Sequence, residues 1–302
     1  MQTITPFLWF DNQAEEAVSF YTSIFEDGKE SGATRYGESG SEISGNPRGS
    51  VMTVPFQLER QSFVALNGGP HFKFNPSISF VVTCETEEEV DRLWKKLSDG
   101  GSTLMELQKY EWSEKYGWLQ DRYGLSWQIF LGRLADVGQK VTPSLLFVGK
   151  QHGRAEEAVK FYTSIFKDSR TDGILRFASG EDGQEGTVKH AQFALNNHVF
   201  MAMDGGLDHA FTFNEAISFV VNCATQEEID YYWNALSEGG DPNAQRCGWL
   251  KDRFGVSWQI VPTILGQLMQ GSDAKKSERL MSALLKMTKL NMEELQRAYD
   301  GE

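Results

Sequence analysis

The chain contains two copies of one sequence pattern, and this internal repeat constrains the fold more than any other feature. Residues 14–25 read AEEAVSFYTSIF and residues 155–166 read AEEAVKFYTSIF, which differ only where Lys160 replaces Ser19. Two further phrases recur in the same order: SISFVVTC at 77–84 returns as AISFVVNC at 216–223, and GWLQDRYGLSWQI at 117–129 returns as GWLKDRFGVSWQI at 248–260. The period is far longer than the roughly 20–50 residues of solenoid repeats, so the pattern indicates duplicated domains.

The domain boundaries follow from these phrases. A length of 302 residues is typical of about two domains. We expect a first copy at 1–135, a second copy at 141–265 and a separate tail at 272–302, with the polar segment 132–142 as the linker. Each copy is long enough to bury a hydrophobic core of its own.

The charge balance excludes some classes of partner. The formal net charge is −13 and the pI is about 4.9, whereas a nucleic-acid partner needs a basic surface that releases counterions. The N-terminus lacks the basic region of a signal peptide, and no apolar run approaches the ~18 residues of a membrane span. We therefore expect a soluble cytoplasmic protein with no nucleic-acid partner and no membrane partner.

The cysteines agree with a reducing compartment, because there are three of them and none forms a CxxC pair. Cys84 and Cys223 stand at equivalent strand ends, where we expect small buried hydrophobic side chains. Cys247 takes the place that Tyr116 has in the first copy. It is either an inert buried thiol or a thiol close to the functional site.

The sequence pattern of the first copy predicts two units of the type βαβββ. The first unit opens with a strand at 4–10 and a helix at 14–25, for which Asn12 and Glu15 have the spacing of an N-cap with a returning carboxylate. A mobile loop is expected at 38–48. Further strands are expected at 33–36, 51–58 and 62–66.

The second unit repeats this order. Thr86 and Glu89 form a capping box before a helix that ends at Gly100 and Gly101. Its strands are expected at 78–83, 103–107, 118–122 and 126–131. The second copy follows the same course with a capping box at Thr225 and Glu228, so the prediction is an α+β fold of four βαβββ units.

The tail after residue 262 has a different pattern. Its Leu and Met residues recur at helical spacing over 277–289, and Asn291 with Glu294 caps a second short helix. We expect a C-terminal helical hairpin whose apolar face packs on the body of the protein.

The opening PFLWFDNQAEEAVSFYTSIF, the closing DRFGVSWQI and the serial βαβββ units resemble the PhnB-like branch of the vicinal oxygen chelate superfamily, which includes glyoxalase I, bleomycin-resistance proteins and extradiol dioxygenases. The resemblance covers about residues 3–262 and implies two tandem glyoxalase-like domains, in which pairs of units form a cupped sheet. Proteins of this branch are often labelled 3-demethylubiquinone-9 3-methyltransferase. Methyl transfer from S-adenosylmethionine normally requires a glycine-rich turn after a strand, and no GxGxG run occurs here.

The resemblance also implies a place for a divalent metal. Superfamily members hold the ion through His, Glu or Gln side chains on first and last strands, and the last-strand position falls at Gln128 and Gln259. The first strands, TPFLWF and TPSLLF, carry no ligand, and the five histidines lie elsewhere. Gln128 and Gln259 are therefore candidate ligands of a degenerate metal site, and the presence of a divalent metal stays open.

The expected lining of the cups is aromatic and rich in amides and hydroxyls, which suits a flat or apolar small molecule. Core packing of the large aromatic rings is the alternative interpretation. Asp121 and Asp252 begin turns and have a structural interpretation. The candidate ligand-binding residues are Trp9, Ser79, Trp118, Trp127, Gln128, Ser218, Trp249, Trp258 and Gln259.

Three classes of function remain. The first is a non-catalytic binder of a small apolar or aromatic molecule, and the second is a metal-dependent lyase, isomerase or dioxygenase. The third is a structural or partner-binding protein whose tail is the working surface. Because related single-length proteins pair as two-fold homodimers, the resemblance further implies an internal pseudo-dimer that is monomeric or weakly dimeric as a whole chain.

Overall fold

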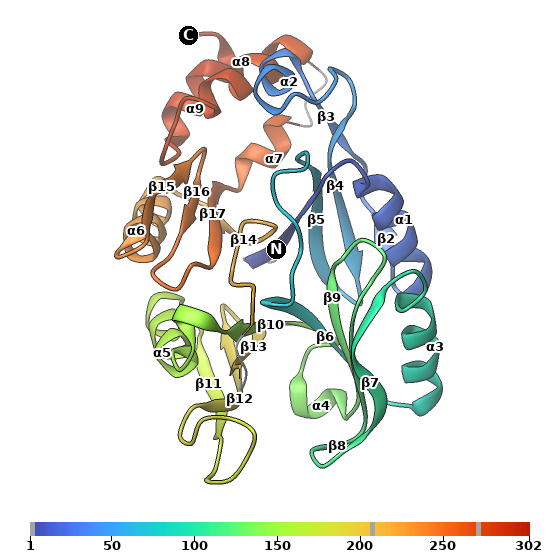
Figure 1. Ribbon diagram of the computed structural model, residues 1–302. Helices are drawn as coiled ribbons and strands as arrows, with labels where there is room; N and C mark the ends of the chain where they lie inside the picture. The colour runs from blue at the N-terminus through green and yellow to red at the C-terminus, as the bar shows by residue number, and fades with distance from the viewer. Residues whose placement is uncertain (1–3, 206–208, 270–272) are drawn as a thin grey trace. The chain divides into compact units, whose positions relative to one another are not determined.

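The computed structural model describes residues 4–205, 209–269 and 273–302, and it folds into four βαβββ modules followed by helices (Figure 1). Module 1 contains β1 (Ile4–Phe10), α1 (Ala14–Ile24), β2 (Lys29–Glu30), β3 (Thr34–Arg35), α2 (Glu38–Ser44), β4 (Val51–Leu58) and β5 (Gln61–Asn67). Module 2 contains β6 (Ile78–Cys84), α3 (Glu87–Leu97), β7 (Ser102–Tyr110), β8 (Ser113–Gln120) and β9 (Ser126–Leu131), followed by α4 (Leu134–Val137).

The second copy repeats this order. Module 3 contains β10 (Val141–Phe147), the 3₁₀ turn η1 (Gly149–Gln151), α5 (Ala155–Ile165), β11 (Arg170–Arg176), β12 (Val188–Leu195) and β13 (His198–Asp204). Module 4 contains β14 (Ile217–Cys223), α6 (Gln226–Ser237), β15 (Asp241–Arg246), β16 (Trp249–Lys251) and β17 (Ser257–Pro262). The tail forms α7 (Ile264–Met269), α8 (Ala274–Leu284) and α9 (Met292–Asp300). The α+β class, the four βαβββ modules and the helical tail predicted from the sequence are confirmed.

The chain forms two compact units, and each unit combines modules from both copies. Unit 1 comprises Met1–Lys73 and Asn214–Glu302, and unit 2 comprises Phe74–Phe213. The sheet of unit 1 has the order β15-β16-β17-β14-β1-β5-β4-β2, with β3 on β4, and that of unit 2 has the order β11-β12-β13-β10-β6-β9-β8-β7. Module 1 thus pairs with module 4 and module 2 with module 3, so the units cut across the spans 1–135 and 141–265.

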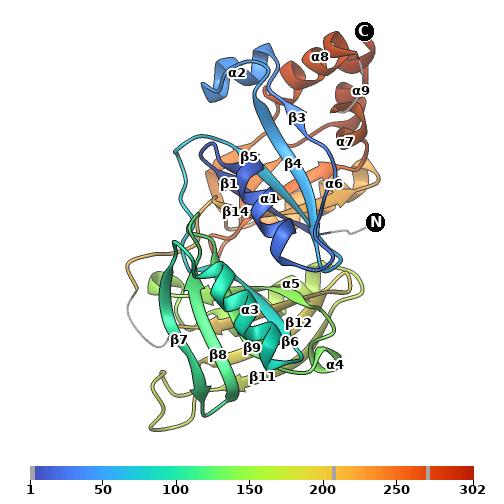
Figure 2. The same cartoon turned by 90° about the vertical axis from the view of Figure 1, so that its right-hand side faces the viewer.

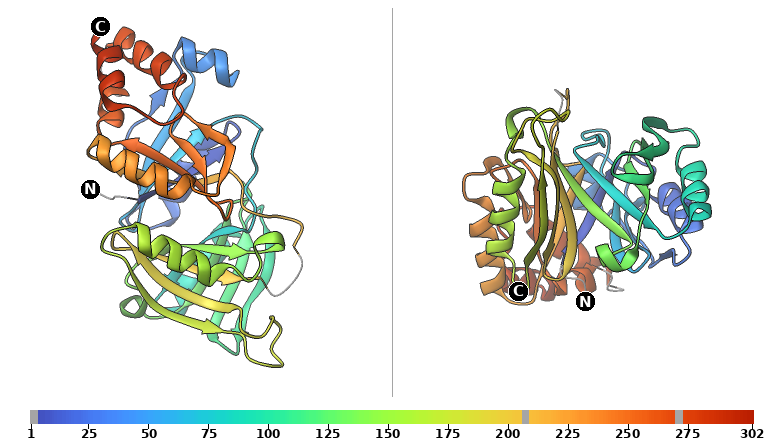
Figure 3. Two further views of the ribbon diagram at one scale, coloured as in Figure 1. Left: turned by 90° about the vertical axis from the view of Figure 1, so that its left-hand side faces the viewer. Right: turned by 90° about the horizontal axis from the view of Figure 1, so that it is seen from below.

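The two central strands of each sheet join the modules. In unit 1, β1 and β14 are antiparallel with Thr5 opposite Val220, and in unit 2, β10 and β6 repeat the register with Thr142 opposite Val81. Within each module the first strand runs parallel to the last one. The helices cover one face of each sheet, as α6 (orange) and α5 (light green) do in Figure 3 (left). The opposite face of each sheet is concave and free of these helices.

The first helix of each copy begins at a side chain from a distant strand, so the expected cap at Asn12 is wrong. Asn67, at the end of β5, accepts a hydrogen bond from the Ala14 backbone N–H at 2.8 Å and donates one to the Val51 carbonyl at 3.1 Å. In the second copy, Asp204 accepts from the N–H groups of Ala155 at 3.2 Å and Val188 at 2.8 Å. One polar residue therefore ties the helix start to two strands and satisfies one of the N–H groups that a helix start leaves free.

The other predicted caps are confirmed. The hydroxyls of Thr86 and Thr225 accept from the backbone N–H groups of Glu89 at 3.2 Å and Glu228 at 3.3 Å. The Glu89 and Glu228 carboxylates return to the backbone N–H groups of residues 85 and 224, which completes two capping boxes.

The segment expected as a mobile loop contains helix α2, and the tail packs beside it. The Glu278 carboxylate on α8 accepts from the backbone N–H groups of Glu38 at 2.9 Å and Ser39 at 2.6 Å, which begin α2. Leu280, Leu290 and Leu295 form the buried core of the tail. Figure 2 shows α2 and α8 side by side at one end of unit 1.

Among the described helices, none combines the length and the hydrophobicity that a transmembrane span needs.

The pairing of module 1 with module 4, and of module 2 with module 3, predicts how fragments of the chain behave. In a fragment of residues 1–135, β1 lacks β14 and β6 lacks β10, so two central strands present unpaired edges that can pair with another chain. Light scattering is expected to find dimers or aggregates for this fragment. Residues 74–213 contain both modules of unit 2 in one continuous segment, and we expect this fragment to be a folded monomer. A stable monomeric fragment 1–135 with the melting temperature of the intact chain would contradict this pairing of modules between the two copies.

Candidate functional site

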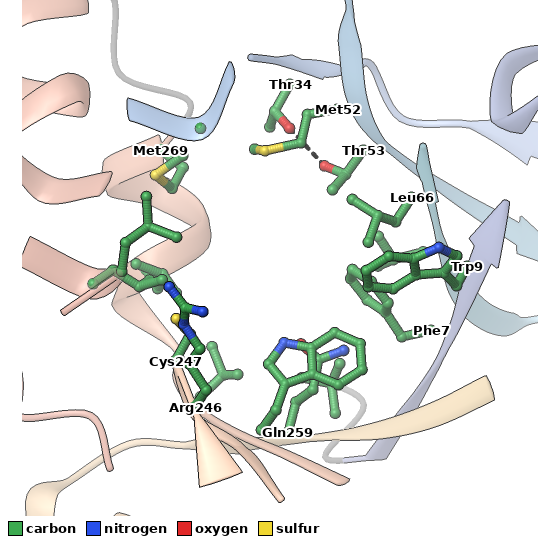
Figure 4. A pocket seen from close by; sticks show the side chains of 18 of the residues that line it. Phe7, Trp9, Thr34, Met52, Thr53, Leu66, Arg246, Cys247, Gln259 and Met269 are labelled. Carbon is green, nitrogen blue, oxygen red and sulfur yellow. Dashed lines mark hydrogen bonds between the residues drawn. The ribbon is translucent and has the colours of Figure 1, made fainter. Parts of the chain in front are cut away.

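The candidate site is a cavity of about 980 Å³ on the concave face of unit 1 (Figure 4). Its floor is formed by cavity-facing side chains of β1, β5, β14 and β17 together with the Trp249 ring of β16. Its sides are formed by β3, β4 and β15, and its cover by α2, α7 and α8. Both copies of the repeat and the tail therefore contribute to one cavity. A volume of this size lies at the upper end of the usual range for small-molecule sites, about 300–1,000 Å³.

The floor carries three large aromatic rings in edge-to-face contact. Phe7 and Trp9 lie on β1 and are half-buried, because alternate residues of that strand face the cavity. The Trp249 ring on β16 meets both of them, with centroids 5.7 Å from Phe7 and 6.1 Å from Trp9. The Trp9 indole N–H donates to the Gly69 carbonyl at 2.8 Å, and a Cβ at Gly68 would lie 2.2 Å from the indole. Glycine at that position is thus required by the ring behind it.

The amide of Gln259 lies between these rings and the centre of the sheet. Its Nε2 donates to the Ser218 hydroxyl at 3.0 Å, and Oε1 receives no hydrogen bond from any described residue. The Trp249 indole N–H likewise donates to no described residue. Gln259 Oε1 and the Trp249 indole N–H are thus an acceptor and a donor that a ligand can use.

The equivalent amide in unit 2 is fully engaged. Gln128 Nε2 donates to the Ser79 hydroxyl at 2.6 Å, and the Tyr116 phenol donates to Gln128 Oε1 at 2.9 Å. Burial raises the pKa of Tyr116 well above its ordinary value, so the phenol keeps the proton that it donates. Cys247 stands in unit 1 where the repeat has Tyr116, and this replacement leaves Gln259 Oε1 free.

The concave face of unit 2 is filled by its own side chains. Val81, Val199 and Met201 on the sheet pack with Val137 of α4, and Phe130 adds to this cluster. The linker helix α4 therefore packs on the concave face of unit 2. Trp118 also lies in unit 2, where its indole N–H donates to the Ser126 hydroxyl at 2.8 Å.

Two of the predicted tryptophans face away from the cups. Trp127 and Trp258 are each 1% exposed, and their indole N–H groups donate to Asp121 and Asp252 at 2.8 Å. These aspartates also accept from backbone N–H groups of their turns, which confirms the structural interpretation of the turns. Neighbouring residues on a strand face opposite sides, so Trp258 is directed away from the face that Gln259 occupies.

The nine predicted site residues therefore fall into three groups. Trp9, Trp249 and Gln259 meet at the cavity, and Ser218 lies behind Gln259. Ser79, Trp118 and Gln128 belong to the filled cup of unit 2, while Trp127 and Trp258 are core residues. Phe7 was missed although period-two alternation from Trp9 indicates it. Cys247, which the repeat offered as a thiol close to the site, also lines the cavity, whereas no pattern in the sequence indicated Tyr36, Met52, Arg246 or Met269.

The cover of the cavity is apolar, and the side formed by β3 and β4 carries hydroxyl groups. Met269 of α7 and Met281 of α8 line the cover, and Ile43 of α2 does so with 53% of its surface exposed. On the opposite side, the hydroxyls of Thr34 and Thr53 are 2.6 Å apart (Figure 4). Flexible methionines adapt to ligands of different shapes.

The donor set does not fit a divalent metal. The side chains of β1, β5, β14 and β17 that line the cavity are apolar, aromatic, amide or hydroxyl groups, and none of them is a carboxylate or an imidazole. Divalent ions in such sites need several carboxylate or imidazole ligands that converge on one point. In the part of the chain that the structure describes, no three His, Cys, Asp or Glu side chains form such a group. Gln259 alone stands at a metal-ligating position.

Comparisons with known proteins agree with the duplicated fold. A family model described as 3-demethylubiquinone-9 3-methyltransferase matches residues 2–130 and 139–261. A search of curated protein sequences finds no match.

Three solved structures illustrate the similarity. The PhnB protein from Bacillus cereus is 43% identical and aligns over 43% of this chain and 100% of its own, with a TM-score of 0.40. Glyoxalase I from Zea mays is 10% identical over 86% of this chain and 91% of its own, with a TM-score of 0.54, and shares the fold. A glyoxylase/bleomycin resistance protein/dioxygenase domain from Frankia sp. EAN1pec is 17% identical over 42% of this chain and 89% of its own, with a TM-score of 0.31.

The contrast between the two concave faces predicts losses of stability that differ in size for one substitution made in each unit. Val220 and Val81 occupy equivalent register positions, but Val220 faces the cavity and Val81 packs against Val137, Val199 and Met201. Val81→Phe overpacks this cluster and is expected to cost about 1–3 kcal/mol of unfolding free energy. Val220→Phe has room and is expected to cost less than about 1 kcal/mol. Urea unfolding measures both, and equal losses would contradict the assignment of open and filled faces.

The donor set also predicts weak metal binding. Calorimetric titration of the intact chain with Zn²⁺ or Ni²⁺ is expected to show no stoichiometric, sub-micromolar site, because Gln259 is the single ligand at the position. The protein is purified without an affinity tag and analysed for elements beforehand. One tightly held divalent ion per chain would refute this expectation.

Proposed function

Because the chain belongs to the 3-demethylubiquinone-9 3-methyltransferase family, as a tandem member of the PhnB-like branch of the glyoxalase superfamily, we propose that it binds a small apolar or aromatic molecule in the cavity of unit 1. The proposal is for a binder or sequesterer rather than a metal-dependent catalyst. Unit 2 is assigned a supporting role, since its concave face is filled.

The observation that carries this proposal is the aromatic floor under an apolar cover. Phe7, Trp9 and Trp249 present ring faces and edges to a cavity whose cover is mainly Met, Leu and Ile side chains. Such a lining stabilises a flat apolar body by burial and by ring–ring contact, and a few polar groups set its orientation. Gln259 Oε1 and the Trp249 indole N–H are polar groups of this kind.

The alternative activity, a metal-dependent lyase, isomerase or dioxygenase, needs ligands that the cavity floor does not provide. Gln259 is a neutral and weak ligand, and its amide already donates to Ser218. Methyl transfer, which the family label names, lacks support from the sequence because no glycine-rich nucleoside turn follows a strand. We therefore favour binding over either reaction.

The binding proposal predicts one saturable site for a neutral aromatic probe. N-phenylnaphthylamine, whose fluorescence rises in apolar surroundings, is expected to bind the intact chain once per molecule. Val220→Phe and Gly266→Phe each place a phenyl ring at the cavity and are expected to abolish this binding. A Cβ at Gly266 meets no atom within 4 Å, so the added side chain has space there.

The matched control is Gly173→Phe in unit 2, where a Cβ also meets no atom within 4 Å. This variant adds the same ring outside the cavity and is expected to bind the probe as the unmodified chain does. Melting curves confirm that each variant is folded. Absence of saturable binding, or binding that both cavity variants retain in full, would refute the proposed function.

A further inference from the structure

Arg246 brings a positive charge to the wall of this apolar cavity. It is the last residue of β15, and its side chain reaches into the cavity beside Cys247, on the side opposite Phe7 and Trp9 (Figure 4). A guanidinium presents several N–H donors in a planar fork that matches the two oxygens of an acidic group. Arg246 pairs with Trp249 in the β15–β16 ladder, so its charge bears on which ligands the cavity accepts.

No described carboxylate lies within ion-pair distance of Arg246, although the chain carries 42 acidic residues against 29 basic ones. The cavity is lined by one glutamate, Glu215, and this side chain is paired with Lys251 at 2.9 Å. The neighbouring thiol does not supply a negative charge, because burial raises the pKa of Cys247 despite the lowering effect of Arg246. The protein itself leaves the charge of Arg246 without a counter-charge in the described cavity.

Arg246 is exposed at the edge of the cavity, and its guanidinium can form a charge-assisted hydrogen bond with a bound anion. The Trp249 N–H and Gln259 Oε1 are neutral: the N–H can donate to a hydroxyl or carbonyl of a ligand, and Oε1 can accept from a hydroxyl or amide. The cavity thus combines one cationic contact at the wall with ring contacts and neutral hydrogen-bonding groups on the floor.

We propose, building on the binding function above, that the ligand is an organic monoanion: an apolar or aromatic body that lies on the Phe7, Trp9 and Trp249 rings and carries one acidic group, a carboxylate or its equivalent, paired with Arg246. A single charge is favoured over a phosphate dianion. Among the described residues that line the cavity, Arg246 has no lysine or second arginine beside it to balance another charge.

The test compares two ligands that differ in charge and little else. Naphthoate and the matching naphthamide have the same ring system and nearly the same shape, and each is titrated against the intact chain loaded with N-phenylnaphthylamine. Naphthoate is expected to displace the probe at about ten-fold lower concentration than naphthamide, the size of one charge-assisted contact. Added salt is expected to weaken the binding of naphthoate but not that of naphthamide, because salt screens the charge interaction.

Arg246→Gln is expected to lower the affinity for naphthoate about ten-fold and to change the affinity for naphthamide by no more than about two-fold. The control is Arg253→Gln, which removes an equal charge from module 4 outside the cavity, where Arg253 pairs with Glu238. This control is expected to leave the affinity of both ligands unchanged.

Equal affinities of naphthoate and naphthamide for a chain that binds the probe would overturn the monoanion proposal and leave the binding function standing. An equal loss of affinity for naphthoate in Arg246→Gln and Arg253→Gln would also overturn it, because the effect would then come from the net charge of the protein. Failure of the neutral probe itself to bind would refute the binding function and the monoanion proposal together.

Discussion

The antiparallel pairing of β1 with β14 is the interaction on which the rest of unit 1 depends. Thr5 lies opposite Val220 in this ladder, so strands from the two ends of the chain become neighbours. Each strand brings its own parallel partner, β5 or β17, and these four strands form the floor of the cavity. The floor cannot form from either copy alone. The loop-closure entropy of joining such distant segments is offset by two strands whose side chains are almost wholly buried.

The two units began from one pattern and now differ in what occupies the concave face. In unit 2, hydrogen bonds from Tyr116 to Gln128 and from Gln128 to Ser79 satisfy the polar groups of that face. The apolar cluster around Val137 packs on it. In unit 1, Cys247 replaces the phenol, and the chain after the last strand continues into the tail. Two copies on one chain can diverge in this way, whereas the identical subunits of a symmetric homodimer would carry every substitution twice.

The sequence allowed the modules to be predicted, but not their pairing. Strand periods, capping boxes and the repeat identify each βαβββ module, because these signals are local. β6 and β14 read ISFVVTC and ISFVVNC, so nothing in either strand indicates which of them pairs with β1. The N-cap from Asn67 escaped prediction for the same reason, since a contact across 53 residues has no local spacing. Trp258 is a different case, because strand alternation already separates it from Gln259.

The position of Arg246 depends on a shortened hairpin and on the tail. In unit 2, β7 and β8 extend to a turn beyond the Tyr110–Ser113 pair, whereas β15 and β16 turn between Arg246 and Trp249. Cys247 and Gly248 have φ angles of 55° and 83°, which suit a two-residue hairpin but strain a cysteine backbone. The backbone N–H groups of Cys247 and Gly248 donate at 2.8 Å to the carbonyls of Met287 and Thr288 in the tail. The tail thus holds the strained turn in place, and with it the cation that stands at the wall of the cavity.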